Sequence, residues 1–433
     1  MISPSEEQQK SALWRLFFIS SGMITLFYWN CLLNMATYFD KTIKKGLFVN
    51  MTFSYSLGNI ISFLTSRFIF RKLKSRFEMF FHMGIASICF TIMIVLIEIF
   101  KSDDFKEIIC LAMILLFAFF GSAFQGNLSG FSSSCGPTSI VLFNLGLALA
   151  GFGSNVLAIF FVYIFPTTDE AIEKKNLQRQ MISYLIVLSV FVLIYFVILY
   201  YFLKYFGHFV NSLDSSKNVT KAIMKNDQIL LDSEDQKNQE NDLKPLKSSD
   251  IKSTSTWKTK NSEPIYSVFK VWVRLLDLWF GIIFNYFITL EIVCFMIPNL
   301  TDQYDSGNQY FLLLYLFLYN LGDTLGRMIP GKLNFKNSSF LHVFNLIRGV
   351  IQVYFIYILL STPPSVLTHS AFRGAVIFLI GTSNGFFTNN FFCTAASRFS
   401  TAVNRDLGGF LIIFGLIVGV ATGTLSGVLW NIK

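Results

Sequence analysis

The segment Tyr319–Arg327 reads Tyr-Asn-Leu-Gly-Asp-Thr-Leu-Gly-Arg and lies inside an otherwise apolar stretch from about residue 311 to residue 329. Asp323 and Arg327 are four residues apart, so in a helix their side chains lie one turn apart on the same face and can pair. Asn320 extends this polar face. A charged side chain in the middle of a bilayer costs about 2.5–3.5 kcal/mol, so such groups usually face a bundle interior or a water-filled cavity. We therefore predict that this segment forms one wall of a polar cavity inside a membrane protein.

The composition of the whole chain also indicates a membrane protein. Of the 433 residues, 53% are hydrophobic and only 14% are charged, whereas a soluble domain carries about 25% charged residues. The formal net charge is +9, but the basic residues lie mostly between the apolar runs, where Lys and Arg set topology and meet lipid headgroups. The expected partner is therefore the lipid bilayer and not a nucleic acid.

Eleven apolar windows are long enough to cross a membrane as helices, since one crossing takes about 20 residues. The windows are residues 12–38, 47–69, 77–100, 107–131, 138–165, 181–206, 271–298, 309–331, 339–361, 371–396 and 406–430. The sequence therefore predicts an all-α membrane protein with eleven transmembrane helices. An odd number of crossings would place the two termini on opposite faces of the membrane.

Residues 207–265 are rich in Ser, Lys, Asp, Asn and Gln and lack apolar periodicity, so we expect a disordered cytoplasmic linker there. It would separate an N-terminal six-helix half (residues 1–206) from a C-terminal five-helix half (residues 266–433). Basic residues cluster at positions 71–76, which favours a cytoplasmic location for that loop, the linker and the N-terminus. Lys41, Lys44 and Lys45 favour the opposite orientation.

Other windows also carry polar residues at membrane depth. Trp29 lies in the middle of the first window, where an indole can stack on a flat ligand or pack between helices. Gln125 in the fourth window offers a donor and an acceptor, either to a ligand or to a neighbouring helix. Glu291 in the seventh window could couple transport to protons, and Arg348 in the ninth could complement Asp323. The residues alone leave these alternatives open.

Four short polar motifs follow one another along the chain. In order they are Trp29-Asn30, Gln125-Gly126, Asn320-x-x-Asp323-x-x-Gly326-Arg327 and Ser383-Asn384-Gly385. Together they resemble the motifs of the equilibrative nucleoside transporters, the solute carriers that move nucleosides, and sometimes nucleobases, down their gradients. Each motif is weak alone, but four in order, with a long polar segment after the sixth window, are fairly specific. The resemblance implies a fold like that of the major facilitators, with 6+5 pseudo-symmetric halves and a substrate between them near the middle of the membrane.

The resemblance also implies a substrate site made by both halves. On the base side, Trp29, Leu26 and Leu33 would contact the base, Gln125 would hydrogen-bond its edge, Gly121 would leave room for it, and Asn30 would lie beside the indole. On the ribose side, Asp323 and Arg327 would bind the hydroxyls, with Asn320 alongside. The implied function is facilitative transport of nucleosides by a monomer. The implied location is the plasma membrane, with an internal membrane as the alternative.

Two other functions are alternatives to this one. A carrier of sugars or another polar metabolite, coupled to protons through Asp323 or Glu291, would have a similar architecture. An enzyme is not expected, because the four histidines are scattered near window ends or in loops and the sequence contains no metal cluster, phosphate loop or nucleophile motif. We therefore expect no cofactor, no metal and no obligate protein partner.

Overall fold

The structure is a computed structural model that describes residues 5–69, 75–166, 170–240, 264–293, 297–305, 309–331, 338–360 and 369–431. All regular structure within these residues is helical. The helices are α1 (Glu6–Lys10), α2 (Ala12–Asn34), α3 (Ala36–Thr42), α4 (Leu47–Ile69), α5 (Ser75–Ile99), α6 (Asp103–Ser134), α7 (Pro137–Ile164), α8 (Glu170–Glu240), α9 (Val268–Glu291), α10 (Ile297–Tyr304), α11 (Gln309–Met328), the 3-10 turn η3 (Ile329–Gly331), α12 (Ser338–Leu360), α13 (Ser370–Ser397) and α14 (Ala402–Asn431).

Each predicted window coincides with a long helix of the structure. Eight of the described helices are both long and apolar enough to cross a membrane, namely α2, α4, α5, α6, α7, α8, α9 and α14. Windows eight to ten fall on α11, α12 and α13, which are 20, 23 and 28 residues long. The chain is therefore an all-helical membrane protein, and the count of eleven crossings stays a prediction.

Two of the windows hold parts of two helices. The first window contains both α2 and α3, which meet at Met35. The seventh contains α9, which ends at Glu291, and the start of α10 at Ile297, and residues 294–296 lie outside the described residues. Hydropathy marks apolar length without marking where a helix ends, which is why one window can hold parts of two helices.

Local chemistry explains where several helices begin. The Ser11 hydroxyl accepts a hydrogen bond from the Trp14 amide and so satisfies one of the free N–H groups at the start of α2. Between α6 and α7 the chain turns at Gly136, whose φ of +112° is a conformation that L side chains rarely adopt. Pro137 then begins α7, where its missing N–H costs nothing.

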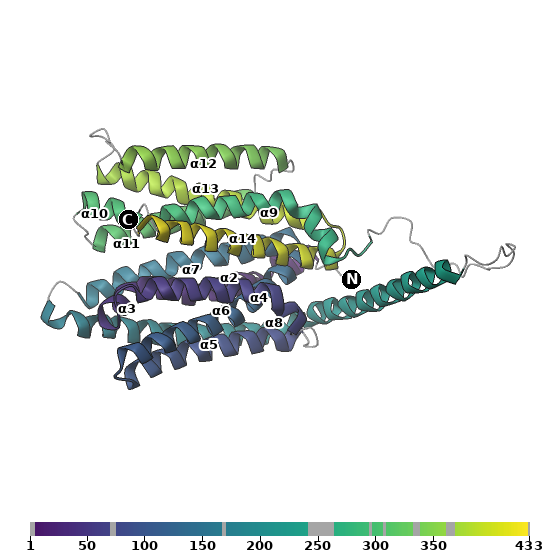
Figure 1. The fold of residues 1–433 in the computed structure, drawn as a ribbon, viewed down its shortest axis with the longest axis horizontal. Coiled ribbons are helices and arrows are strands. Elements are labelled where there is room, and N and C mark those ends of the chain that lie inside the picture. The colour runs from purple at the N-terminus through teal and green to yellow at the C-terminus, as the bar shows by residue number, and fades with distance from the viewer. Residues whose placement is uncertain are drawn as a thin grey trace.

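The long helices run side by side, and α8 extends beyond the bundle (Figure 1). Helices α2 to α8 form one side of the bundle and α9 to α14 form the other. The chain ends marked N and C lie at opposite ends of the bundle (Figure 1). The two sides meet where α7 contacts α11 and where α6 contacts α14. At the second contact the Ser129 hydroxyl donates to the carbonyl of Gly409 at 3.0 Å.

The structure differs from the expected disordered linker over part of its length. Helix α8 continues to Glu240, so residues 207–240 are helical. The sequence argument rested on the absence of apolar residues, which excludes burial of this segment but not a helix that continues an existing one, because elongation needs no new nucleus. Residues 241–263 lie outside the described residues, as do residues 71–74 of the basic cluster.

Helices α11 and α13 approach each other closely enough to exclude any side chain at four positions. A Cβ at Gly322, Gly326, Gly381 or Gly385 would lie only 2.0–2.2 Å from a backbone oxygen of the opposite helix. Small residues of this kind allow helices to pack backbone to backbone within a membrane. This packing holds the Asp323 turn of α11 directly against the Asn384 turn of α13.

Candidate functional site

Asp323 and Arg327 form the buried ion pair that their spacing predicts. Both guanidinium atoms Nε and Nη2 of Arg327 lie 3.0 Å from Oδ2 of Asp323. Both side chains are almost fully buried: 4% of the Arg327 side chain and 6% of the Asp323 side chain are exposed. Neither group points into bulk solvent, in agreement with the prediction that the pair lies inside the bundle.

Arg327 also connects the two sides of the bundle. Its Nη1 donates to the carbonyl of Asn144 on α7 at 3.0 Å, and its Nη2 donates to the hydroxyl of Tyr286 on α9 at 3.1 Å. The amide of Asn144 donates to Asn389 on α13, which in turn donates to the backbone carbonyl of Arg327. A single guanidinium therefore contacts one helix of the N-terminal side and two of the C-terminal side.

The second oxygen of Asp323 is held by α13. The Nδ2 of Asn384 donates to Oδ1 of Asp323 at 2.7 Å and to the hydroxyl of Tyr319 at 3.1 Å. Each carboxylate oxygen thus accepts from a different side chain. Oδ2 already accepts two hydrogen bonds from Arg327, whereas Oδ1 can accept a further one from a ligand. The motif Ser383-Asn384-Gly385 brings Asn384 to this position because Gly385 lets α13 lie against α11.

Asn320 lies one turn before Asp323, at the contact with α7. Its Nδ2 donates to the carbonyl of Leu316 on its own helix, and it is half-buried. A Cβ at Gly151 on α7 would lie 2.3 Å from its Oδ1. Asn320 therefore occupies the space that this glycine leaves, between the two sides of the bundle.

Trp29 is part of an aromatic stack in the N-terminal side. Its indole lies parallel to the ring of Tyr55 on α4, with centroids 3.7 Å apart and an interplanar angle of 6°, and Phe48 lies beyond at 6.3 Å. Trp29 is 9% exposed. One face of the indole is thus already covered by a protein ring, which the sequence did not indicate.

The remaining residues predicted on the base side differ in their surroundings. Asn30 donates to the carbonyl of Leu26 on its own helix at 2.9 Å, so it does not bridge two helices. Leu26 is half-buried against the core, while Leu33 is 38% exposed. Hydrogen bonding back to the preceding turn is a common outcome for a short polar side chain inside a helix.

Gln125 and Gly121 on α6 have properties that suit a ligand site. Gln125 is only 4% exposed, and its Nε2 has no hydrogen-bond partner among the residues that the structure describes. Buried amide donors are normally paired, so an unpaired one requires an explanation. Around Gly121, a Cβ would meet no heavy atom of the described chain within 4 Å.

The predicted residues thus fall into two groups. One comprises α2 and α6 with Trp29 and Gln125, the other α11 with Asn320, Asp323 and Arg327. Helix α7 packs against both α2 and α11. Sequence reasoning did not identify Tyr55, Tyr286 or Asn144, because a single Tyr or Asn in an apolar run carries no spacing signal that would distinguish it from packing.

Comparison with known proteins identifies the family. The sequence model described as "Nucleoside transporter" matches residues 111–432. The chain belongs to the nucleoside transporter family. The matched region covers Gln125, the α11 segment and the α13 motif, and it begins after Trp29. A search of curated proteins returned no match for this transporter.

Solved structures show the fold class of this chain. A bacterial homologue of the iron transporter ferroportin in an outward-facing state superposes with a TM-score of 0.55 at 13% identity, covering 96% of this chain and 92% of that one. A bacterial homologue of the human lysosomal transporter Spinster gives 0.52 at 14% identity, covering 98% and 84%. The human organic anion transporter TETRAN gives 0.51 at 12% identity, covering 97% and 94%. At these identities the likeness concerns the fold alone, and it is the helical fold of major-facilitator-like transporters.

Proposed function

We propose that this protein transports nucleosides down their gradient by alternating access, without coupling to a second ion. The observation that carries the proposal is the buried Asp323–Arg327 pair, placed at the contact between α7 and α11. In a transporter of this fold class the ligand has to contact both helix bundles. A charged pair at the contact between the two bundles is placed to bind such a ligand. Membership of the nucleoside transporter family supports a nucleoside as that ligand.

The proposed binding mode follows from the chemistry of a nucleoside, which joins a neutral planar base to a polyol. The aromatic shelf of Trp29 and Tyr55, with Leu26 and Leu33, would hold the base by stacking and apolar contact. The unpaired amide of Gln125 would donate to the edge of the base.

The ribose would lie against α11. Its hydroxyls would donate to Asp323 and accept from Arg327, with Asn320 beside them. Since Arg327 also holds the Asn144 carbonyl, a ribose that competes for this guanidinium would change the contact between the two sides of the bundle.

The proposed topology has eleven crossings, with α11, α12 and α13 added to the eight helices that meet both criteria. Residues 1–206 would form the six-helix half and residues 266–433 the five-helix half, joined by a cytoplasmic segment at 207–265. The N-terminus would lie in the cytoplasm, and the protein would act as a monomer in the plasma membrane. Its substrates would be nucleosides, and nucleobases are a second class of substrate to be tested.

Uptake into proteoliposomes tests the function. We expect saturable uptake of labelled uridine, adenosine or inosine in the absence of any sodium or proton gradient, with competition by unlabelled nucleosides. Empty liposomes and an excess of a hexose provide the controls. Competition by hexoses but not by nucleosides, or uptake only when the outside is acidic, would instead indicate a coupled carrier of another polar metabolite.

Replacing Trp29 tests the base side of the site. Trp29→Ala is expected to raise the KM for uridine about tenfold, because one aromatic stacking contact with a base is worth about 1–3 kcal/mol. Trp29→Phe should keep most of the affinity, and Leu16→Ala, at an exposed position of the same helix, should leave KM unchanged. Equal KM values for Trp29→Ala and wild type at equal protein levels would remove the indole from the site.

A further inference from the structure

Arg348 on α12 is a buried cation whose hydrogen-bond partners among the described residues are all neutral. Its Nε donates to the Ser383 hydroxyl at 2.8 Å and its Nη2 to the Thr289 hydroxyl at 2.8 Å. Its Nη1 donates to Oδ1 of Asn285 on α9 and to Oδ1 of Asn345 at 3.4 Å. Only 8% of the residue is exposed. Burying a guanidinium without a counter-charge costs free energy, and hydrogen bonds to its N–H groups have to offset that cost.

The partners of Arg348 lead by hydrogen bonds to the ion pair on α11. The Nδ2 of Asn285 donates to Oδ1 of Asn384 at 2.9 Å, and the Nδ2 of Asn384 donates to Oδ1 of Asp323 at 2.7 Å. The Thr289 hydroxyl, which accepts from Arg348, lies 2.6 Å from the carbonyl of Asn285 and 3.2 Å from Oδ1 of Asn384, and its single proton can be donated to only one of them. We call the series Arg348–Asn285–Asn384–Asp323 the amide relay.

The two ends of the amide relay determine the orientation of its middle. A guanidinium can only donate and a carboxylate can only accept. Because Asn285 presents its oxygen to Arg348, its nitrogen faces Asn384. Because Asn384 receives the donor of Asn285 on its oxygen, its nitrogen faces Asp323, which as a carboxylate can only accept. Arg348 therefore fixes the orientation of Asn285 and keeps its donor on the oxygen of Asn384, although it does not touch Asp323.

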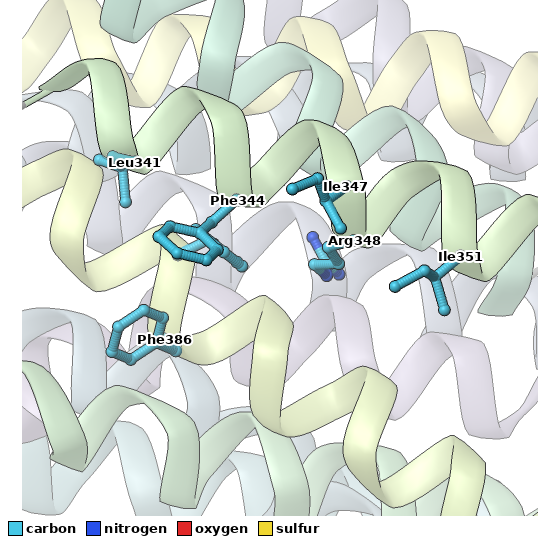
Figure 2. A pocket seen from close by; sticks show the side chains of 7 residues that line it. Leu341, Phe344, Ile347, Arg348, Ile351 and Phe386 are labelled. Carbon is cyan, nitrogen blue, oxygen red and sulfur yellow. The ribbon is translucent and has the colours of Figure 1, made fainter.

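A cavity beside Arg348 does not account for its burial. A cavity of about 300 Å³ lies between α12 and α13, and it is lined by Leu341, Phe344, Ile347, Ile351, Phe386 and Phe387 together with Arg348 (Figure 2). Its lining is apolar apart from Arg348, and several of these side chains are exposed on the outer face of α12. The hydrogen bonds of Arg348 go instead to α9 and α13.

We propose that Arg348 is a positioning residue for the ribose side of the site, a proposal that rests on the proposed function. Acting through the amide relay, Arg348 keeps an amide donor on Oδ1 of Asp323 and so holds the carboxylate in the rotamer in which it also binds Arg327 and receives the ribose hydroxyls. Loss of Arg348 frees Asn285 to turn, so Asn384 loses the donor on its oxygen and is no longer held where its nitrogen binds Asp323. Selectivity for substrates with ribose hydroxyls then falls, more than transport of substrates without them.

The test compares uptake efficiency for uridine and for 2′,3′-dideoxyuridine in proteoliposomes. Arg348→Met should lower the ratio of the two efficiencies at least about tenfold, since a hydrogen bond to a charged group is worth about 1.5–3 kcal/mol. Arg348→Lys, which still only donates, should keep the ratio within about threefold of wild type. Arg373→Met is the matched control: Arg373 is a buried arginine that pairs with Asp305 at 2.6 Å outside the amide relay, so its loss should lower both efficiencies equally.

Asn285→Asp keeps the test decisive if Arg348→Met does not fold. An aspartate at position 285 gives Arg348 a counter-charge and therefore favours folding, but it has no donor for Asn384. The nitrogen of Asn384 should then turn to the new carboxylate, and the uptake ratio should fall as in Arg348→Met. An unchanged ratio in Asn285→Asp overturns the amide relay, whereas a wild-type protein that takes up no uridine, or takes up both nucleosides equally well, overturns the proposed function or its ribose site.

Discussion

Asp323→Asn is expected to lower uridine uptake at least about tenfold, because the ribose hydroxyls lose a hydrogen bond to a charged group, which is worth about 1.5–3 kcal/mol, and each 1.4 kcal/mol is a factor of ten. The exchange keeps the size of the side chain and removes its charge, leaving Arg327 buried without its 3.0 Å partner. The measurement is the initial rate of uptake into proteoliposomes, normalised to the amount of folded transporter.

A double variant separates a structural role of the pair from a role in binding. Asp323→Asn combined with Arg327→Gln leaves no unpaired charge, so the amount of folded protein should recover toward wild type. Uptake should stay as low as in Asp323→Asn, because neither a carboxylate nor a guanidinium remains for the ribose. Recovery of uptake along with folding would mean that the pair only holds α11 in place.

Gly385→Ala is expected to cost both stability and transport. The added methyl group would lie 2.0 Å from the carbonyl oxygen of Asp323 and 2.9 Å from the amide nitrogen of Arg327, so the backbones of α11 and α13 would have to separate. Overpacking of this kind costs about 1–3 kcal/mol. It also moves Asn384 away from Asp323, so we expect a lower melting temperature and at least about a tenfold loss of uptake.

Gly84→Ala on α5 is the matched control for this prediction. A Cβ at Gly84 meets no heavy atom of the described chain within 4 Å. Alanine is favoured over glycine in a helix by about 1 kcal/mol, so this variant should be at least as stable as wild type and should transport normally. Equal melting temperatures for Gly385→Ala and Gly84→Ala would contradict the close packing of α11 on α13.

Several site features could be predicted from the sequence because they are local. The Asp323–Arg327 pair depends only on the pitch of one helix, and the structure contains it. The ordered motifs pointed to α13 as well as α11, and Asn384 and Gly385 do lie against Asp323. The sequence allows Arg348 either to complement Asp323 or to lie near the bundle axis, and the structure places two amides between Arg348 and Asp323.

Other features could not be predicted because they depend on which faces of different helices meet. Tyr55 covers one face of Trp29 from α4, and Asn144 offers Arg327 a backbone carbonyl from α7. Asn30 bonds to its own helix, although its sequence context equally allowed a contact with a ligand or a neighbour. The depth of a polar residue in an apolar run can be estimated from sequence, but the direction in which it points across the bundle cannot.

The sequence by itself determined that this chain is a helical membrane protein, where its long helices lie, and that one of them carries an ion pair at membrane depth. It could do so because a helix in lipid satisfies its backbone hydrogen bonds within one segment, so length and apolarity suffice to identify it. The tertiary structure adds that Arg327 joins α7 to α11, that hydrogen bonds through Asn285 and Asn384 connect Arg348 to Asp323, and that α8 continues to Glu240. The first two depend on the register between packed helices, which the spacing of residues along any one helix does not specify.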